Sequence, residues 1–287
     1  MYKSKRFAYS YEETQENGKN ASTMIDDILA DKDFLQLEEI VIGCWGEPWE
    51  NGDGAQALID GIVSNREKFA RVKSLFIGDM DYEDCEVSWI VQADYSALWQ
   101  AMPQLEKLTI KGSVGLSLGE IRHEHLKCLE IICGGLPASV MKQIQDARLP
   151  SLEKLLLYIG VEDYGFDGDM STVRALLEKS DFPDLSYLGL TDSELQDEIA
   201  EAVLESKYIT QIQTLDLSMG TLTDVGGQLL LDQIGHYPNV KTLDLHYHFL
   251  SDNMMTKLSE LNAEVYLEGQ ESAEGYGGEI YYPMLTE

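Results

Sequence analysis

Two histidines and two aspartates near the end of the chain are its best candidates for metal chemistry. His246 and His248 are one residue apart, and Asp216 and Asp244 occupy matching places in two similar segments. Alternate residues of a strand point the same way, so both imidazoles and two carboxylates could ligate a divalent metal. The alternative is that the two aspartates, about 5 Å apart on neighbouring strands, bond to nearby serine and threonine hydroxyls. The sequence favours this alternative, and we expect no cofactor.

Two further groups have residue types that could support catalysis or calcium binding, but they lack the local environment or spacing that this would require. Cys85 stands among carboxylates, whereas a reactive thiolate needs a base and an electropositive environment. The acidic loop from Gly78 to Asp84 lacks the spacing and the glycine of a calcium-binding loop. No phosphate loop or nucleophile elbow is present. We therefore expect no catalytic residue and interpret the chain as a binding protein, not an enzyme.

The elements that must position these side chains follow from one recurring phrase: aliphatic, two residues, aliphatic, one residue, aliphatic. Its eight copies occupy residues 37–42, 72–77, 105–110, 126–131, 152–157, 185–190, 212–217 and 240–245. A weaker ninth copy lies at 263–267. One such unit cannot bury its own apolar face, so the units must stack on one another.

Apolar residues with helical spacing lie between most of these phrases, and several of the intervening segments end in proline just before the next phrase. Helices are predicted near residues 24–29, 57–63, 90–102, 140–147, 173–177, 195–204, 225–230 and 254–261. The step from Leu108 to Leu129 is too short for a helix, so an irregular return is expected there through residues 111–115. The pattern predicts one curved α/β solenoid with a parallel sheet on its concave face.

Several segments carry a resemblance to a known family. They are Val41–Gly46, Ile77–Asp79 with Cys85–Ile90, Leu215–Gly220 and Leu243–His248. They resemble a bacterial family of cytoplasmic leucine-rich-repeat proteins of uncharacterised function, whose strand–helix units are similar to those of ribonuclease inhibitor. The resemblance covers nearly the whole chain and implies a right-handed leucine-rich-repeat horseshoe of about 8–9 repeats, but no activity. The asparagine that often follows each repeat strand is missing, so other groups must satisfy the turns.

Composition limits the possible partners. The chain has 51 acidic and 21 basic residues, a formal net charge of −30. Nucleic-acid binding requires a basic face, and anionic membranes repel such a protein, so both are excluded as partners. No signal peptide or apolar run of membrane-spanning length is recognisable. Four cysteines without metal-site spacing are expected to be free thiols, which favours a cytoplasmic location.

The chain is expected to have three parts. Residues 1–20 form an N-terminal capping segment in which Phe7–Tyr11 alternates like an edge strand. Residues 21–267 form the solenoid. Residues 268–287 form an acidic, glycine-rich tail that is expected to be largely flexible. Within the tail, the apolar segment 280–285 could dock on the solenoid or on a neighbouring molecule.

The expected function is non-catalytic binding of a partner protein with a basic patch, through the concave sheet and the loops that leave its strands. The predicted partner-binding residues are Trp45, Trp49, Phe76, Asp79, Lys107, Glu130, Tyr158, Tyr164, Tyr187, Asp216, Asp244, His246 and Tyr247. Trp45 and Tyr247 could instead pack sideways on adjacent turns.

Three alternatives remain open on the sequence alone. The protein could be an inhibitor or a GTPase regulator, similar in architecture to ribonuclease inhibitor or the Ran GTPase activator. It could be a metal-dependent accessory factor centred on His246, His248, Asp216 and Asp244. It could also be purely structural and dimerise through an open end or through Tyr281 and Tyr282 of the tail.

Overall fold

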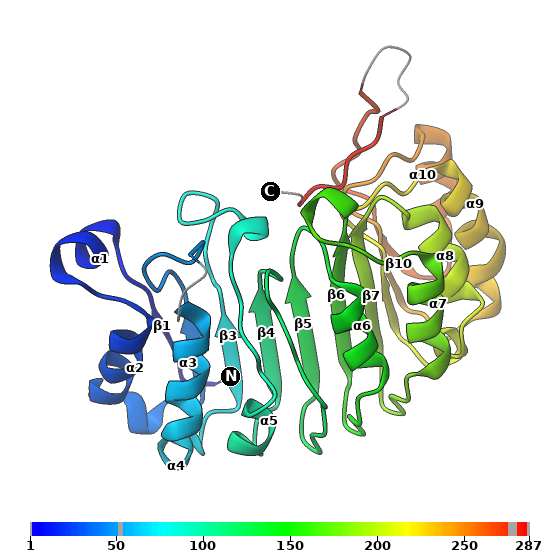
Figure 1. The fold of residues 1–287 in the computed structure, drawn as a ribbon. Helices are drawn as coiled ribbons and strands as arrows, with labels where there is room; N and C mark the ends of the chain where they lie inside the picture. The colour runs from blue at the N-terminus through cyan, green and yellow to red at the C-terminus, as the bar shows by residue number, and fades with distance from the viewer. Residues whose placement is uncertain (1, 51–53, 275–279, 286–287) are drawn as a thin grey trace.

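The computed structural model describes residues 2–50, 54–274 and 280–285, and in this part of the chain ten strands form one sheet. Every strand is parallel to its neighbours, and the spatial order follows the chain from β1 to β10 (Figure 1). The strands are β1 (Ser4–Phe7), β2 (Glu39–Ile42), β3 (Ser74–Ile77), β4 (Lys107–Lys111), β5 (Cys128–Ile132), β6 (Lys154–Gly160), β7 (Tyr187–Ser193), β8 (Thr214–Asp216), β9 (Thr242–Asp244) and β10 (Glu264–Tyr266).

Most of the helices lie on one face of this sheet (Figure 1). The helices are α1 (Tyr11–Asn17), α2 (Ala21–Ala30), α3 (Gly54–Ser64), α4 (Arg66–Phe69), α5 (Leu98–Ala101), α6 (Ala138–Gln145), α7 (Met170–Lys179), α8 (Gln196–Leu204), α9 (Asp224–Gln233) and α10 (Asp252–Leu258). Helices α6 to α10 each contact the next in chain order, as do α2 and α3. Sequential strands with sequential helices make a solenoid-like α/β fold.

The core is the aliphatic spine that the repeat phrase predicts. All three aliphatic residues of each of the eight phrases are no more than 2% exposed. Register aligns the phrases: Ile40 of β2 lies opposite Leu75, and the same position continues across the sheet to Leu215 and Leu243. Each unit therefore buries its leucines against those of its neighbours, which is why a single unit cannot fold alone.

The helix predicted over residues 90–102 is wrong, because only Leu98–Ala101 is helical. Val91 and Asp94 instead pair in parallel with Val114 and Ser117 of the following return. That return has no helix or strand between β4 and β5, as the short spacing predicts. With no helix in the next unit to pack against, the earlier segment extends and pairs through its backbone.

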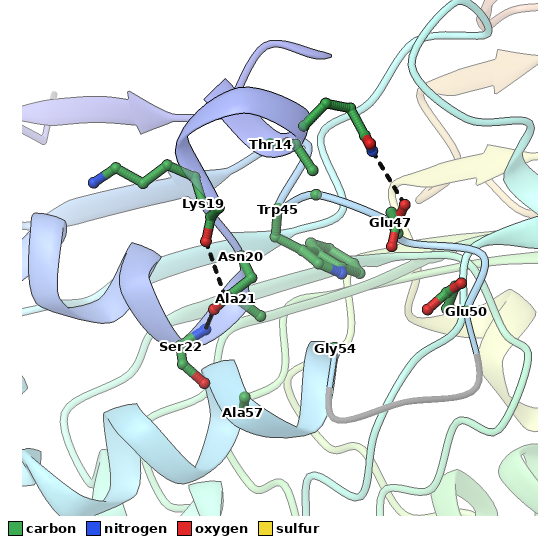
Figure 2. A pocket seen from close by; sticks show the side chains of 13 residues that line it. Thr14, Lys19, Asn20, Ala21, Ser22, Trp45, Glu47, Glu50, Gly54 and Ala57 are labelled. Atoms are coloured by element: carbon green, nitrogen blue, oxygen red, sulfur yellow. Dashed lines mark hydrogen bonds between the residues drawn. The ribbon is translucent and has the colours of Figure 1, made fainter. Parts of the chain in front are cut away.

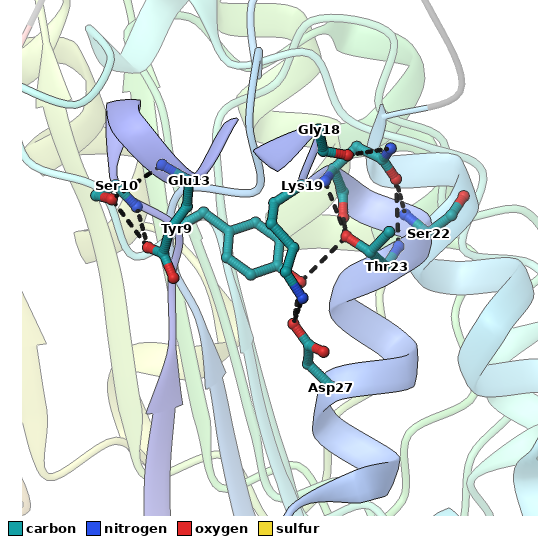
Figure 3. A network of polar contacts seen from close by, with 9 residues as sticks. Tyr9, Ser10, Glu13, Gly18, Lys19, Ser22, Thr23 and Asp27 are labelled. Carbon is teal, nitrogen blue, oxygen red and sulfur yellow. Dashed lines mark hydrogen bonds and ion pairs between the residues drawn. The ribbon is translucent and has the colours of Figure 1, made fainter. Parts of the chain in front are cut away.

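The predicted edge strand at residues 7–11 is displaced toward the N-terminus. Strand β1 pairs with β2 and ends at Phe7, and Ser10 caps helix α1 by accepting a hydrogen bond from the Glu13 N–H. A Ser-x-x-Glu capping box stops the strand here and starts a helix. Figure 3 shows how the segment is fixed: the Tyr9 hydroxyl and the Lys19 ammonium both bond to Asp27 of α2, at 2.7 and 2.5 Å.

Buried polar side chains take over the role of the missing asparagines. The side-chain amide of Gln196 donates to Leu190 O at 2.8 Å, and that of Gln92 donates to Lys111 O at 2.8 Å. His248 bonds to Leu267 O through Nε2. Each side chain satisfies a backbone carbonyl that lies in a strand or directly after one.

Candidate functional site

The face of the sheet opposite the helices carries a row of paired charges. The Glu130 carboxylate lies between two ammonium groups, 3.0 Å from Lys107 Nζ and 2.8 Å from Lys154 Nζ, and it accepts a hydrogen bond from Thr109 at 2.8 Å. Burial raises the pKa of Glu130, but Lys154, Thr109 and Lys107 outweigh it and hold the pKa at about 2. Glu130 therefore pairs with both Lys107 and Lys154.

The row continues toward the C-terminal strands. The Lys154 ammonium lies 4.3 Å from the centre of the Tyr187 ring, and the Tyr187 hydroxyl donates to Asp216. Asp216 also accepts a 2.6 Å bond from the Ser218 hydroxyl, and Tyr158 contacts Met219 Sδ at 3.4 Å. The predicted partner-binding residues on this face thus have intramolecular partners, and their contact with another protein stays a prediction.

The alternative of a histidine–aspartate metal site does not fit the arrangement of these side chains. His246 Nδ1 lies 2.6 Å from Asp244, but His248 is fully buried. Both ring nitrogens of His248 bond to backbone groups, those of Leu267 and Leu250. The strand ends at Asp244, so the expected alternation no longer orients the two rings together. No group of three or more histidine, cysteine or acidic side chains in the described ranges is arranged to hold a metal ion.

Trp45 is not on the rim of the binding surface, contrary to the prediction. It is 1% exposed, because helices α1 and α2 cover the exit of β2. Figure 2 shows its ring between the start of α2 and the start of α3, at a cavity of about 480 Å³. Among the described residues, its Nε1 has no hydrogen-bond partner. Trp45 therefore belongs to the packing of the first repeat.

Three large aromatic side chains meet at the strand-exit edge of the N-terminal half. Trp49, Tyr82 and Trp89 are 46%, 69% and 61% exposed, and with Cys85 and Glu86 they line an open cavity of about 410 Å³. We call these five residues the aromatic cup. Trp49 is a predicted site residue, whereas Trp89 was missed because it directly precedes a segment with a helical pattern. The clustering of three aromatics in the loops around 49 and 82–89 is the signal that could have found it.

The loop beside the aromatic cup is acidic. Asp81, Glu83 and Asp84 are exposed, and Glu86 is half-buried in the wall of the cup. Asp79, a predicted site residue, bonds to Arg6 of β1 at 2.6 Å, which anchors the base of the loop. Burial raises the pKa of the Cys85 thiol to about 11, so the thiol stays protonated near neutral pH and is a poor nucleophile.

The remaining predicted residues lie elsewhere. Phe76 is half-buried on β3, opposite Thr109 of β4, and Tyr164 is half-buried in the turn after β6. The Tyr247 ring packs on Gly269 of the next turn, as the sideways-packing alternative predicts. None of the three lines the aromatic cup.

Within the described ranges, no helix has both the length and the apolar character needed to cross a bilayer. No protein-family model matches the chain, and no curated protein matches it. A crystal structure of a Bacteroides fragilis protein, solved as a structural-genomics target, is similar with a TM-score of 0.89 and 44% sequence identity. The similarity covers 99% of this chain and 77% of the other. The chain belongs to the same family as this Bacteroides fragilis protein.

Proposed function

We propose that the protein is a leucine-rich-repeat module that binds a partner protein through its strand-exit edge and carries out no reaction. The aromatic cup and the acidic loop 79–86 form the centre of this surface. The repeat phrase, its buried aliphatic spine and the sequential parallel sheet support the leucine-rich-repeat assignment. Four free cysteines support a reducing, cytoplasmic location.

The single observation that carries the proposal is the exposure of Trp49, Tyr82 and Trp89 around one cavity. Tryptophan and tyrosine dominate the energetics of protein interfaces, since each buries a large rigid surface and retains a polar atom. A cluster of three exposed aromatic side chains is unfavourable in water, and such clusters mark surfaces that bind a partner.

The carboxylates specify the partner. A cation near an indole or phenol face is attracted by the ring, and the attraction grows as water is excluded. Glu86 places a carboxylate in the wall of the cup, and Asp81 and Glu83 extend the negative surface. The net charge of −30 adds long-range attraction for cations. We therefore expect a partner that inserts an arginine or lysine side chain into the cup.

The concave sheet has a secondary part in this proposal. Glu130 already pairs with the two lysines beside it, so a partner gains little by replacing these contacts. The paired row occupies the centre of the sheet, while the acidic aromatic surface stands at its edge.

The proposal is tested by titrating the protein with an octa-arginine peptide and following tryptophan fluorescence. Removal of two aromatic walls in the Tyr82→Ala, Trp89→Ala double variant is expected to weaken binding by about 10-fold or more. The matched control is Tyr11→Ala, which removes an aromatic side chain that is 81% exposed on α1 and should leave binding unchanged.

A second pair of variants distinguishes binding at the aromatic cup from general attraction by the negative net charge of the protein. Glu86→Gln removes a carboxylate from the cup, whereas Glu198→Gln removes an exposed carboxylate from α8. The proposal requires a larger loss for Glu86→Gln. Equal effects of the two substitutions would show that the peptide responds only to net charge, and the proposed surface would be wrong.

A further inference from the structure

The chain near the ends of β7, β8 and β9 has an unusual backbone conformation. Asp192, Met219 and Tyr247 have φ angles of 56°, 66° and 54°, and they are all the non-glycine residues with positive φ in the described part of the chain. Each stands two residues after the last aliphatic of its repeat phrase. Side chains disfavour this left-handed conformation, so it persists where the surrounding structure requires it.

The three residues form a regular platform, which we call the exit column. The N–H of Asp192 donates to Ser218 O and that of Met219 donates to His246 O, at 2.9 and 2.8 Å. The N–H of Tyr247 makes the equivalent bond to Glu268 O at 2.8 Å. The same conformation and the same type of hydrogen bond therefore recur in three successive units.

The chain's own residues 280–285 lie on this column, at the edge where the strands end (Figure 1). The N–H of Met284 donates to Met219 O at 2.8 Å, and the N–H of Leu285 donates to Asp192 Oδ1 at 2.7 Å. Pro283, just before them, is buried and lines a cavity of about 190 Å³ together with Tyr247 and other residues. Two backbone N–H groups and one proline therefore make the main attachment.

Most of this segment remains in contact with solvent. Ile280, Tyr281, Tyr282 and Met284 are 45%, 41%, 58% and 51% exposed. The Tyr281 ring packs edge-on against the Phe249 ring, with 4.9 Å between the ring centres. This contact buries the Tyr281 side chain only in part. Segments with few buried apolar contacts open at low cost, so the attachment is suited to release.

The segment also leaves the column incompletely satisfied. Asp192 is 0% exposed and Thr191 is 1% exposed, yet within the described ranges Asp192 Oδ2 and Thr191 Oγ1 have no hydrogen-bond partner. Buried polar atoms without partners are rare and destabilising. A ligand that offers one more hydrogen-bonding group at this place would bind better than the chain's own segment does.

We propose that the exit column is a binding site for an extended, proline-containing segment of a partner protein, and that residues 280–285 occupy it as a self-ligand which the partner displaces. Proline holds a peptide in an extended form before binding, and recognition of such peptides commonly pairs an aromatic pocket with hydrogen bonds to the backbone. The exit column has both: the Tyr247 pocket for the proline, and two acceptors for the N–H groups that follow it. This site is separate from the aromatic cup and does not depend on it.

The test uses the full-length chain and a fluorescent, end-capped peptide with the sequence of residues 280–285. In the unaltered protein the tethered segment competes at an effective concentration of about 1 mM, which keeps the added peptide out. Leu285→Pro removes the N–H that donates to Asp192 and releases the tethered segment. Anisotropy should then show at least about 10-fold tighter peptide binding than to the unaltered chain.

Further variants identify the acceptor. Adding Asp192→Ala to the Leu285→Pro chain should abolish peptide binding, whereas adding Asp192→Asn keeps an acceptor oxygen and should retain it. Tyr282→Ala is the matched control within the segment, since it keeps both N–H groups and should continue to exclude the peptide. Circular dichroism verifies that each variant is folded. Equal binding to the unaltered and Leu285→Pro chains, no binding to the Leu285→Pro chain, or binding that persists with Asp192→Ala would overturn the proposal.

Discussion

Replacing Glu130 by glutamine removes the central charge of the concave row while it preserves the size of the side chain. Glu130 is 8% exposed and pairs with Lys107 and Lys154, so its loss leaves two ammonium groups facing each other across β5. The pKa of Glu130 falls from the ordinary 4.5 to about 2. A lowered carboxyl pKa means that the folded state favours the charged form, so the contribution is present above pH 4.5 and is lost as the pH falls toward 2.

The magnitude follows from this difference. Each pKa unit corresponds to about 1.4 kcal/mol, so the full shift represents about 3 kcal/mol as an upper limit. The Lys107 side chain is 40% exposed and that of Lys154 is 32% exposed, so water screens part of the attraction. We therefore expect Glu130→Gln to lower the free energy of unfolding by about 2 kcal/mol at pH 7.

Urea unfolding at pH 7, 5 and 3.5 measures this effect. The difference between the unaltered protein and Glu130→Gln should be constant from pH 7 to 5 and should shrink at pH 3.5. The control is Glu120→Gln, which removes a carboxylate that is 73% exposed and pairs with Arg122 at the surface. Equal stability of Glu130→Gln and the unaltered protein at pH 7, or a difference that does not change with pH, would refute the reasoning.

Three further predictions concern the spine, the exit column and the cup. Leu215 is fully buried, so Leu215→Ala should lower the free energy of unfolding in urea by about 2–5 kcal/mol. Leu215→Asp should abolish the cooperative unfolding transition, because it buries an unpaired carboxylate. A folded Leu215→Asp chain would contradict the assignment of Leu215 to the buried spine. Burial raises the pKa of Asp192 to about 8, so its contribution to stability decreases as the pH rises from about 4 to 8. Thermal melts should therefore show that Asp192→Asn is more stable than the unaltered protein at pH 8. The difference in melting temperature should close toward pH 4. A difference that does not depend on pH would show that the buried carboxyl of Asp192 is not its cause. Because its thiol is protonated, Cys85 should react slowly with iodoacetamide at pH 7.5 in the native protein and rapidly in urea. Mass spectrometry can measure both rates. Fast alkylation of Cys85 in the native protein would disprove the assignment of a protonated, poorly reactive thiol.

The sequence predicts the spine well because its signal is repeated. Eight phrases with the same aliphatic positions leave only one way to bury them, and the structure buries every one. The failure at residues 90–102 has a tertiary cause. Whether Val91 becomes helical or extended depends on the next return, which offers backbone groups for pairing and no helix.

The candidate sites were less predictable, since exposure depends on elements that are distant in the sequence. Trp45 and Trp49 are four residues apart, yet α1 and α2 bury the first and leave the second in solvent. The exit column carries no glycine, so nothing in the sequence marks Met219 or Tyr247 as left-handed. The apolar character of 280–285 did suggest docking, but only the fold brings this segment to Asp192.

Binding of a basic partner at the strand-exit edge can be measured by a carbodiimide footprint of the carboxylates with and without bound octa-arginine peptide. We expect protection of Asp81, Glu83 and Glu86 at the aromatic cup, with unchanged labelling of Glu198 and Glu201 on α8. Uniform protection of all these carboxylates, or protection of the α8 pair alone, would contradict this expectation.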